Sequence, residues 1–98
     1  MKIIDGGVCA AQGFTAGSIR SGIKESRTND DTAIIFSECE CTAAATYTMN
    51  RVKAAPLYVT MEHLENGVVR AIVANAGNAN ACAPDGMENA RRMAKAAA

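Results

Sequence analysis

The sequence lacks tryptophan and has only two phenylalanines and two tyrosines among its 98 residues. Proteins that bind single-stranded nucleic acid stack the bases on aromatic side chains, and this chain has too few of them for such a platform. Its formal net charge at pH 7 is zero, with ten basic and ten acidic residues. It therefore also lacks the excess positive charge that holds nucleic acid or an anionic membrane. Both observations argue against nucleic acid and membrane as partners.

Long apolar runs are absent as well. No stretch approaches the length of a membrane span, and residues 1–7 lack the apolar core of a signal peptide. We therefore expect a cytoplasmic protein. The composition, with 49% hydrophobic and 20% charged residues, is that of an ordinary globular chain of one small domain.

The four cysteines do not have the spacing of a metal site. Cys39 and Cys41 are separated by one residue, whereas zinc knuckles and thioredoxin-type motifs separate their cysteines by two. We expect these two, with Cys9 and Cys82, to be reduced thiols, some of them buried as small hydrophobic residues. The single histidine, His63, has no ligand partner at helical spacing, and we expect it at the surface. The sequence thus predicts no metal site and no cofactor.

Motifs of well-known enzyme classes are also missing. The chain has no GxxxxGK[ST], GxGxxG, HExxH or GxSxG pattern, and its histidine lies in no recognisable triad context. The residues alone therefore show no catalytic set.

Hydrophobic periodicity predicts a mixed α+β fold, with a largely antiparallel or mixed sheet and a packed amphipathic helix. Strands are expected at residues 14–23, 32–37, 43–49 and 68–75, and the main helix is expected at 85–98. A short helical turn over 61–65 is also expected, with Thr60 as its cap and Gly67 as its end.

The helix at 85–98 has the clearest pattern. Asp85 and Glu88 resemble a capping box, and Glu88 is spaced to pair with Arg91 or Arg92. Four apolar residues fall on one face, namely Met87, Ala90, Ala94 and Ala97. Because no glycine, proline or polar stop follows, we expect that the helix or the chain continues beyond Ala98.

Residues 75–82 (Asn-Ala-Gly-Asn-Ala-Asn-Ala-Cys) follow the strand expected at 68–75 and place three asparagines among small residues. Each amide carries donors and an acceptor on a short stem. Gly77 permits a tight bend with close approach by another part of the backbone. Two interpretations stay open: a well-bonded turn between strand and helix, or a loop against which a ligand sits.

Residues 50–56 (Asn-Arg-Val-Lys-Ala-Ala-Pro) are the second unusual stretch. One interpretation is a solvated basic turn. The other is that Asn50, Arg51 or Lys53 reaches an anionic group or a carboxylate elsewhere in the fold.

Together, these two stretches resemble the N-terminal region of the ornithine acetyltransferase family, the bifunctional glutamate N-acetyltransferase and amino-acid acetyltransferase of arginine biosynthesis. Residues 13–14, 34–35 and 42–44 fall in the order expected for the family, and the resemblance covers nearly the whole chain. The sequence departs from the family at Ala76, where serine is more frequent, and at residues 83–84, where a polar residue and glycine are usual.

The resemblance implies that residues 1–98 are the N-terminal part of a larger acetyltransferase domain, without an internal domain boundary. The full-length enzyme would move the acetyl group of N-acetylornithine to glutamate by a ping-pong reaction, and some members of the family also use acetyl-CoA. The acyl-enzyme would form on a threonine that autocatalytic cleavage makes N-terminal. The implied partners are the rest of the same precursor (the C-terminal part of the alpha chain and the beta chain), the substrates N-acetylornithine and glutamate, and other copies in an oligomer of cleaved chains.

The family's threonine nucleophile and oxyanion donors find no match within these 98 residues. We therefore assign no catalytic residue here and expect the 98 residues alone to be inactive. Asn75, Asn78 and Asn80 are the candidates for an active-site wall or for support of its loop, and we favour the supporting role. The alternative function is a non-enzymatic small-ligand or protein-interaction domain, which would explain the missing nucleophile without a longer chain.

Overall fold

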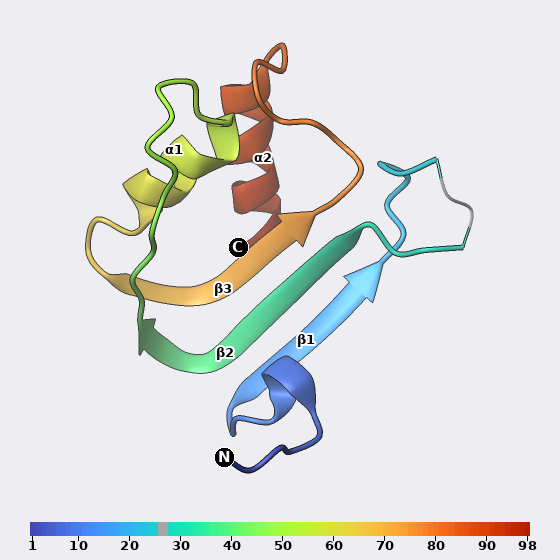
Figure 1. Ribbon diagram of the computed structural model, residues 1–98, viewed down its shortest axis with the longest axis vertical. Coiled ribbons are helices and arrows are strands. Elements are labelled where there is room, and N and C mark those ends of the chain that lie inside the picture. The colour runs from blue at the N-terminus through green and yellow to red at the C-terminus, as the bar shows by residue number, and fades with distance from the viewer. Residues whose placement is uncertain (26–27) are drawn as a thin grey trace.

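The computed structural model describes residues 1–25 and 28–98. It is an α+β structure in which a three-stranded antiparallel sheet carries two helices that pack on each other beside one edge strand (Figure 1). In chain order, the elements are a short 3₁₀ helix at Gly7–Cys9, β1 at Phe14–Ile19, β2 at Thr32–Thr42, α1 at Ala55–His63, β3 at Val68–Asn75 and α2 at Gly86–Ala97. The predicted α+β class, antiparallel sheet and C-terminal helix are confirmed.

β2 is the central strand, and both of its neighbours are antiparallel to it. Ile35 pairs with Ala16 of β1 on one side and with Ile72 of β3 on the other. Directly paired residues share a face of the sheet, so this register places apolar side chains of all three strands next to one another.

β2 is longer than the predicted strand at 32–37, because residues 38–42 continue it. Its pairing with β3 shifts between Phe36 and Cys41, which marks a β-bulge. Arg70 holds this bulge: its guanidinium lies 5.2 Å from the centre of the Phe36 ring and donates to the carbonyls of Ser37 and Glu38 at 3.5 and 2.9 Å. The extra residues are thus accommodated without ending the strand.

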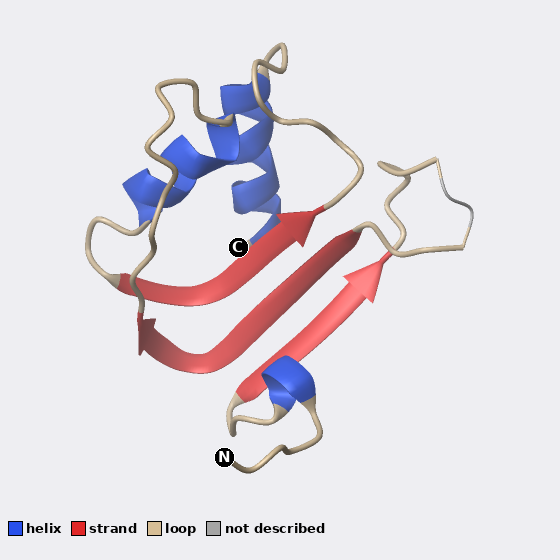
Figure 2. Cartoon of the chain, in the orientation of Figure 1, coloured by secondary structure: helices blue, strands red, loops and turns tan. Residues whose placement is uncertain are grey.

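The predicted strand at 43–49 is wrong. Residues 43–50 form no regular secondary structure, and Figure 2 shows a loop between β2 and α1. β2 and β3 stay paired up to Thr42 and Val68, and the Ala43 N–H then bonds the Gly67 carbonyl at 2.9 Å. The alternating pattern beyond this point has no strand opposite it, so alternation alone does not produce a strand.

β1 also ends earlier than the predicted 14–23. After Ile19, the chain leaves the sheet through a turn at Gly22, whose φ is +89°. The two glycines in the predicted range thus behave differently, because Gly17 stays within β1 while Gly22 breaks the extended conformation.

α1 begins six residues before the predicted turn at 61–65. Pro56 lies in its first turn, where the missing N–H costs nothing. Thr60 is inside the helix instead of capping it, and its hydroxyl donates to the Pro56 carbonyl at 2.8 Å. His63 is exposed at the last helical residue, as predicted, and Gly67 lies in the turn before β3 with φ +68°.

α2 begins as predicted, but its capping box does not form. Asp85 is the N-cap residue with φ +54°, and its side chain makes no capping hydrogen bond. Arg91 pairs with Glu62 of α1 at 3.2 Å instead of with Glu88. Of the predicted apolar face, Ala90, Ala94 and Ala97 are half-buried, while Met87 is exposed.

The described residues form a thin core. Val59 is the one buried apolar side chain among them, while Ile19 and Ile72 of the sheet are 63% and 57% exposed. The expectation that some cysteines are buried is wrong: Cys41 is half-buried, and the remaining cysteines are exposed. Neither helix in the described part of the chain is long and apolar enough to cross a membrane.

Candidate functional site

The predicted asparagine loop leaves the sheet at the end of β3 and runs to α2. Its first residue after the strand, Ala76, donates its N–H to the carbonyl of Asp31 at 2.8 Å. Asp31 immediately precedes β2, so the loop is anchored to the neighbouring strand as well as to its own.

Asp31 is the best-bonded side chain of this region. Its carboxylate accepts backbone N–H bonds from Ser21, Gly22 and Lys24 at 2.7, 3.0 and 3.0 Å. It also accepts the Ser21 hydroxyl at 2.6 Å, and the residue is buried with 3% exposed surface. The carboxylate therefore folds the segment after β1 around itself.

These bonds lower the pKa of Asp31 well below its usual range. The Ser21 hydroxyl has the largest effect and the Lys24 N–H the next, while burial acts in the opposite direction. A carboxylate that accepts several hydrogen bonds is stabilised in its charged form. Asp31 is therefore ionised at neutral pH and serves as an anchor.

Gly77 lets the loop pack closely against residues 21–24, the segment whose backbone bonds the Asp31 carboxylate. Its φ is +95°, which favours glycine, and a Cβ at this position would lie 3.1 Å from the Cα of Lys24. The predicted close approach of another backbone to Gly77 is thus confirmed.

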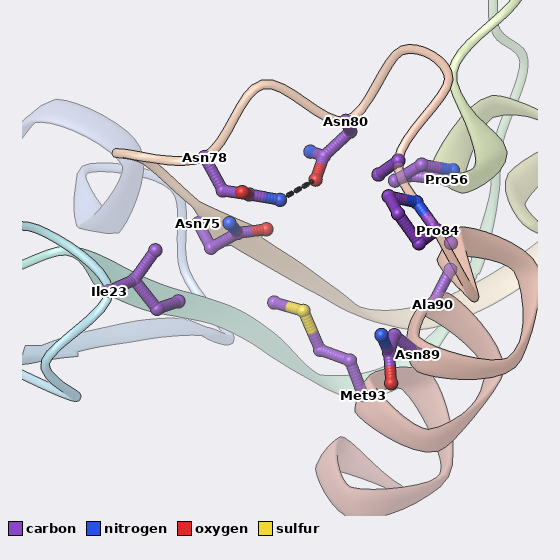
Figure 3. Close-up of a pocket in the computed structure, with 11 residues that line it drawn as sticks. Ile23, Pro56, Asn75, Asn78, Asn80, Pro84, Asn89, Ala90 and Met93 are labelled. Atoms are coloured by element: carbon purple, nitrogen blue, oxygen red, sulfur yellow. Dashed lines mark hydrogen bonds between the residues drawn. The ribbon is translucent and has the colours of Figure 1, made fainter.

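Below the loop lies a cavity of about 350 Å³, which we call the asparagine pocket (Figure 3). All three predicted asparagines line it, and Asn89 of α2 adds a fourth amide. Its apolar lining comes from Ile23, Pro56, Pro84, Ala90 and Met93, and the small residues Ala83 and Gly86 complete it. Among the described residues that line this pocket, none is charged.

The amides of the pocket are arranged so that part of their bonding capacity stays available. Nδ2 of Asn78 donates to Oδ1 of Asn80 at 2.7 Å. This bond leaves Oδ1 of Asn78 as an acceptor and both hydrogens on Nδ2 of Asn80 as donors. Asn75 and Asn80 are half-buried, whereas Asn78 and Asn89 are exposed.

A second hollow of about 460 Å³ adjoins the asparagine pocket and shares Asn80 with it. Lys53 lines this hollow together with acidic residues at the start of α2, Asp85 and Glu88. The Lys53 ammonium donates to the Asn50 carbonyl at 2.9 Å, and Arg51 is exposed. Within the described chain, residues 50–54 thus form a basic turn whose lysine bonds its own backbone, and Pro56 in the first turn of α1 reaches the asparagine pocket.

The loop between the asparagines and α2 contains backbone conformations that are unusual for residues with a side chain. Among the described non-glycine residues, Cys82 and Asp85 have positive φ, at +56° and +54°. Such conformations cost free energy and persist where the surrounding structure determines them. Gly86 follows, and a Cβ there would lie 3.2 Å from the Ala55 Cβ, so the two helices begin close together.

Sequence reasoning found part of this site. It singled out Asn75, Asn78 and Asn80, which the structure brings to one pocket, although their role stays a prediction. It missed Asn89 and Asp31. Asn89 is four residues before Met93 on α2, a spacing that could have predicted a shared face.

No group of three or more histidine, cysteine, aspartate or glutamate side chains in the described chain could hold a metal ion. Cys41 instead donates its thiol to the Ser37 hydroxyl at 3.1 Å. That Cys39 and Cys41 need neither metal nor disulfide stays a prediction.

Comparison with known proteins adds to this geometry. Residues 15–98 match the sequence model of the ArgJ family. The chain belongs to the ArgJ family. It is 46% identical over 96 residues to the arginine biosynthesis bifunctional protein ArgJ of Caldanaerobacter subterraneus subsp. tengcongensis. It is also 46% identical over 94 residues to the glutamate N-acetyltransferase of Methanocaldococcus jannaschii.

Solved ArgJ structures share the fold. The crystal structure of ArgJ from Bacillus halodurans superposes with a TM-score of 0.81 at 41% identity, covering 90% of this chain and 46% of that one. The ornithine acetyltransferase of Mycobacterium tuberculosis, complexed with ornithine, superposes with a TM-score of 0.77 at 41% identity, covering 87% of this chain and 45% of that one. These ArgJ structures agree with the α+β fold described above.

The ArgJ relatives are much longer than this chain. The match covers 97% of this chain but 23% of the Caldanaerobacter protein, and 95% of this chain but 22% of the Methanocaldococcus protein. The chain thus spans about a quarter of the length of the curated relatives that it matches.

Proposed function

We propose that this chain is the N-terminal segment of an acetyltransferase that moves the acetyl group of N-acetylornithine to glutamate in arginine biosynthesis. Membership of the ArgJ family is the observation that carries this proposal. The name of the Methanocaldococcus relative supports glutamate as acceptor, and the ornithine complex of the Mycobacterium relative supports the ornithine side of the reaction.

The proposed chemistry is a ping-pong acyl transfer through a threonine outside these 98 residues. The threonine oxygen attacks the acetyl carbonyl of N-acetylornithine, and its proton passes through the threonine's own amine to the leaving nitrogen. The C–N bond breaks, ornithine leaves, and an acetyl ester of threonine remains. The amine of glutamate then attacks this ester, and the threonine oxygen leaves with a proton to give N-acetylglutamate.

In this proposal, residues 1–98 contribute structure to one side of the active site. The asparagine loop, through Asn75, Asn78 and Asn80, supports a wall near the acyl-transfer centre. The nucleophile and the oxyanion donors come from the rest of the precursor, which is cleaved and assembles as an oligomer in the cytoplasm. Acetyl-CoA is an additional acetyl donor in some members of the resembled family.

The test uses the full-length protein and measures N-acetylglutamate formed from N-acetylornithine and glutamate. Asn78→Ala removes the 2.7 Å bond to Asn80, so the loop loses part of its fixed shape. We expect activity to fall about tenfold to a hundredfold, because small displacements of a positioned site cost that much. Asn66→Ala, in the turn before β3, is the matched control, and we expect it to keep most of the activity. If Asn78→Ala alters neither activity nor stability, the proposed role of the loop is wrong.

A further inference from the structure

We propose that Cys39 and Cys41 form a dithiol that a small disulfide oxidises reversibly to a Cys39–Cys41 disulfide. Both cysteines are free thiols in the structure, so the fold described above is that of the reduced form. The inference goes beyond the proposed function and does not depend on it, because no step of the proposed acetyl transfer uses these two residues.

The chain bends sharply between Ser37 and Cys41, in the part of β2 that curves in Figure 1. Four residues of an extended strand span about 13 Å. The Sγ of Cys41 nevertheless lies 3.1 Å from the Ser37 hydroxyl, to which it donates. The backbone N–H of Cys39 donates to the same hydroxyl at 3.3 Å. The Ser37 side chain, on a residue with 6% exposed surface, therefore holds both cysteines at one point of the bulge.

The sulfur of Cys41 lies within reach of Cys39. It is 3.7 Å from the carbonyl oxygen of Cys39. A carbonyl oxygen is about 2.4 Å from the Cα of its own residue, so this sulfur lies within about 6 Å of the Cys39 Cα. Disulfides join residues whose Cα atoms are about 4.4–6.8 Å apart, a separation that two residues at this spacing reach once the chain bends. Rotation of the Cys39 side chain with a small backbone adjustment can therefore bring the two sulfurs together.

The backbone around Cys39 can make this adjustment because it lies outside the regular strand pairing. The register between β2 and β3 is interrupted between Phe36 and Cys41, and β1 pairs with β2 as far as Ser37. Within the described chain, Cys39 therefore has no partner residue in either ladder. The extra residues of a bulge are left unpaired in this way, so closing the disulfide need not break the sheet.

The two thiols differ in their access to solvent. Cys39 is exposed and Cys41 is half-buried, so Cys39 meets the oxidant first. Glu38 and Glu40 are exposed on either side of Cys39. Their negative charge favours the approach of a positively charged disulfide over that of an anionic one.

The oxidation occurs by two thiol–disulfide exchanges. The Cys39 thiolate attacks one sulfur of the small disulfide, whose S–S bond breaks and releases one small thiolate. The Cys41 thiolate then attacks the sulfur of Cys39, and the second small thiolate leaves. The protons of the two protein thiols end on the two released small thiols, and the small disulfide is reduced as the protein pair is oxidised. Because exposed disulfides are labile, a reducing thiol reverses the change.

The direct test is incubation of the reduced full-length protein with cystamine, a positively charged small disulfide. The remaining thiols are then blocked with iodoacetamide, and the tryptic peptides are weighed by mass spectrometry. Residues 28–51 form one tryptic peptide with both cysteines, whereas Cys9 and Cys82 lie on other peptides. We expect peptide 28–51 to become lighter by two hydrogen atoms without an adduct, and dithiothreitol to restore it. A peptide that stays reduced, or that carries two separate cysteamine adducts, would overturn the inference.

A matched pair of variants tests the roles of the two thiols. Cys41→Ser removes the thiol that closes the disulfide, so its peptide should keep one cysteamine adduct on Cys39. Cys9→Ser makes the same change outside the bulge, and its peptide 28–51 should lose the two hydrogen atoms as in the wild type. Loss of two hydrogen atoms from the Cys41→Ser peptide would contradict the assigned pair.

A synthetic peptide of residues 28–51 tests whether the bulge, and not the spacing alone, brings the thiols together. We expect the disulfide to close about tenfold faster in the folded full-length protein, because a held geometry raises the effective concentration of the attacking thiol. Equal closing rates in peptide and protein would show that the bulge does not position the pair. These measurements require no acetyl transfer, so their outcome is separate from that of the proposed function.

Discussion

The Cα of Lys24 lies 3.1 Å from the position that a Cβ on Gly77 would occupy. Gly77 also has φ +95°, so a side chain here meets both backbone strain and a steric conflict. We expect Gly77→Ala in the full-length protein to lower the free energy of unfolding by about 1–3 kcal/mol, as for other strained backbone positions. Denaturant unfolding measures the change.

Gly17→Ala is the control for this prediction. Gly17 lies within β1 with an ordinary φ, and nothing lies within 4 Å of its missing Cβ. We expect this variant to be neutral or slightly more stable, by up to about 1 kcal/mol, because alanine restricts the unfolded chain. Equal effects of the two substitutions would contradict the assigned contact between Gly77 and Lys24.

Asp31 should make stability depend on pH in the acid range. Its folded pKa is depressed, mainly by the Ser21 hydroxyl, so its stabilising effect is fully present above the unfolded pKa of about 3.9. This stabilisation is lost as the pH falls through the folded pKa. We expect Asp31→Asn to lower the denaturation midpoint at pH 7, and the gap between wild type and variant to shrink below about pH 4.

Asp30→Asn provides the comparison for Asp31→Asn. Asp30 is exposed and accepts the Ser18 hydroxyl at 2.5 Å, whereas three backbone N–H groups converge on Asp31. Its substitution should change the midpoint much less. If the difference in denaturation midpoint between wild type and Asp31→Asn is equal at pH 7 and pH 3, the charge of Asp31 does not stabilise the fold.

Arg70 should contribute to stability through the bulge of β2. We expect Arg70→Ala to cost about 1–3 kcal/mol, since it removes charged hydrogen bonds to carbonyls and the contact with the Phe36 ring. Thermal unfolding of the full-length protein measures this loss. Arg92→Ala, at an exposed position of α2, should change stability by less than about 0.5 kcal/mol.

Residues 1–98 expressed alone should not transfer acetyl groups and should self-associate. The described residues bury one apolar side chain, Val59, and leave Ile19 and Ile72 largely exposed. β1 and β3 are the edges of the sheet, and exposed edges and apolar patches favour association. A transfer assay with size-exclusion chromatography tests both statements. Turnover by a compact monomer would refute them together.

Hydrophobic periodicity predicted the helices and strands whose pattern is contained within one segment of the sequence. The strand at 68–75 is predicted by its continuous apolar run, which precedes the loop. The helix after Asp85 is predicted by its amphipathic repeat, which follows the loop. The predicted strand at 43–49 failed because a strand also needs a partner, which alternation does not supply. The predicted turn at 61–65 is shorter than α1, because Pro56 already marks the first turn of the helix.

The candidate site was predictable only where its residues are close in sequence. The asparagines at 75–80 share one loop, whereas Ile23, Asn89 and Met93 reach the pocket from other elements. The carboxylate of Asp31 organises a segment seven to ten residues earlier in the chain. Helical spacing places Asn89 and Met93 on one face, but their meeting with the loop and Ile23 depends on the assembled fold, which neither periodicity nor a short motif predicts.

The bond from Ala76 to the Asp31 carbonyl has a consequence for the order of folding. The β1–β2 hairpin pairs residues 14–19 with 32–37 and can assemble from local contacts. The asparagine loop requires a partner 45 positions earlier, and closing so long a segment is slower than closing a hairpin. We therefore expect the hairpin to form first and the loop to acquire its shape by joining a surface that already exists.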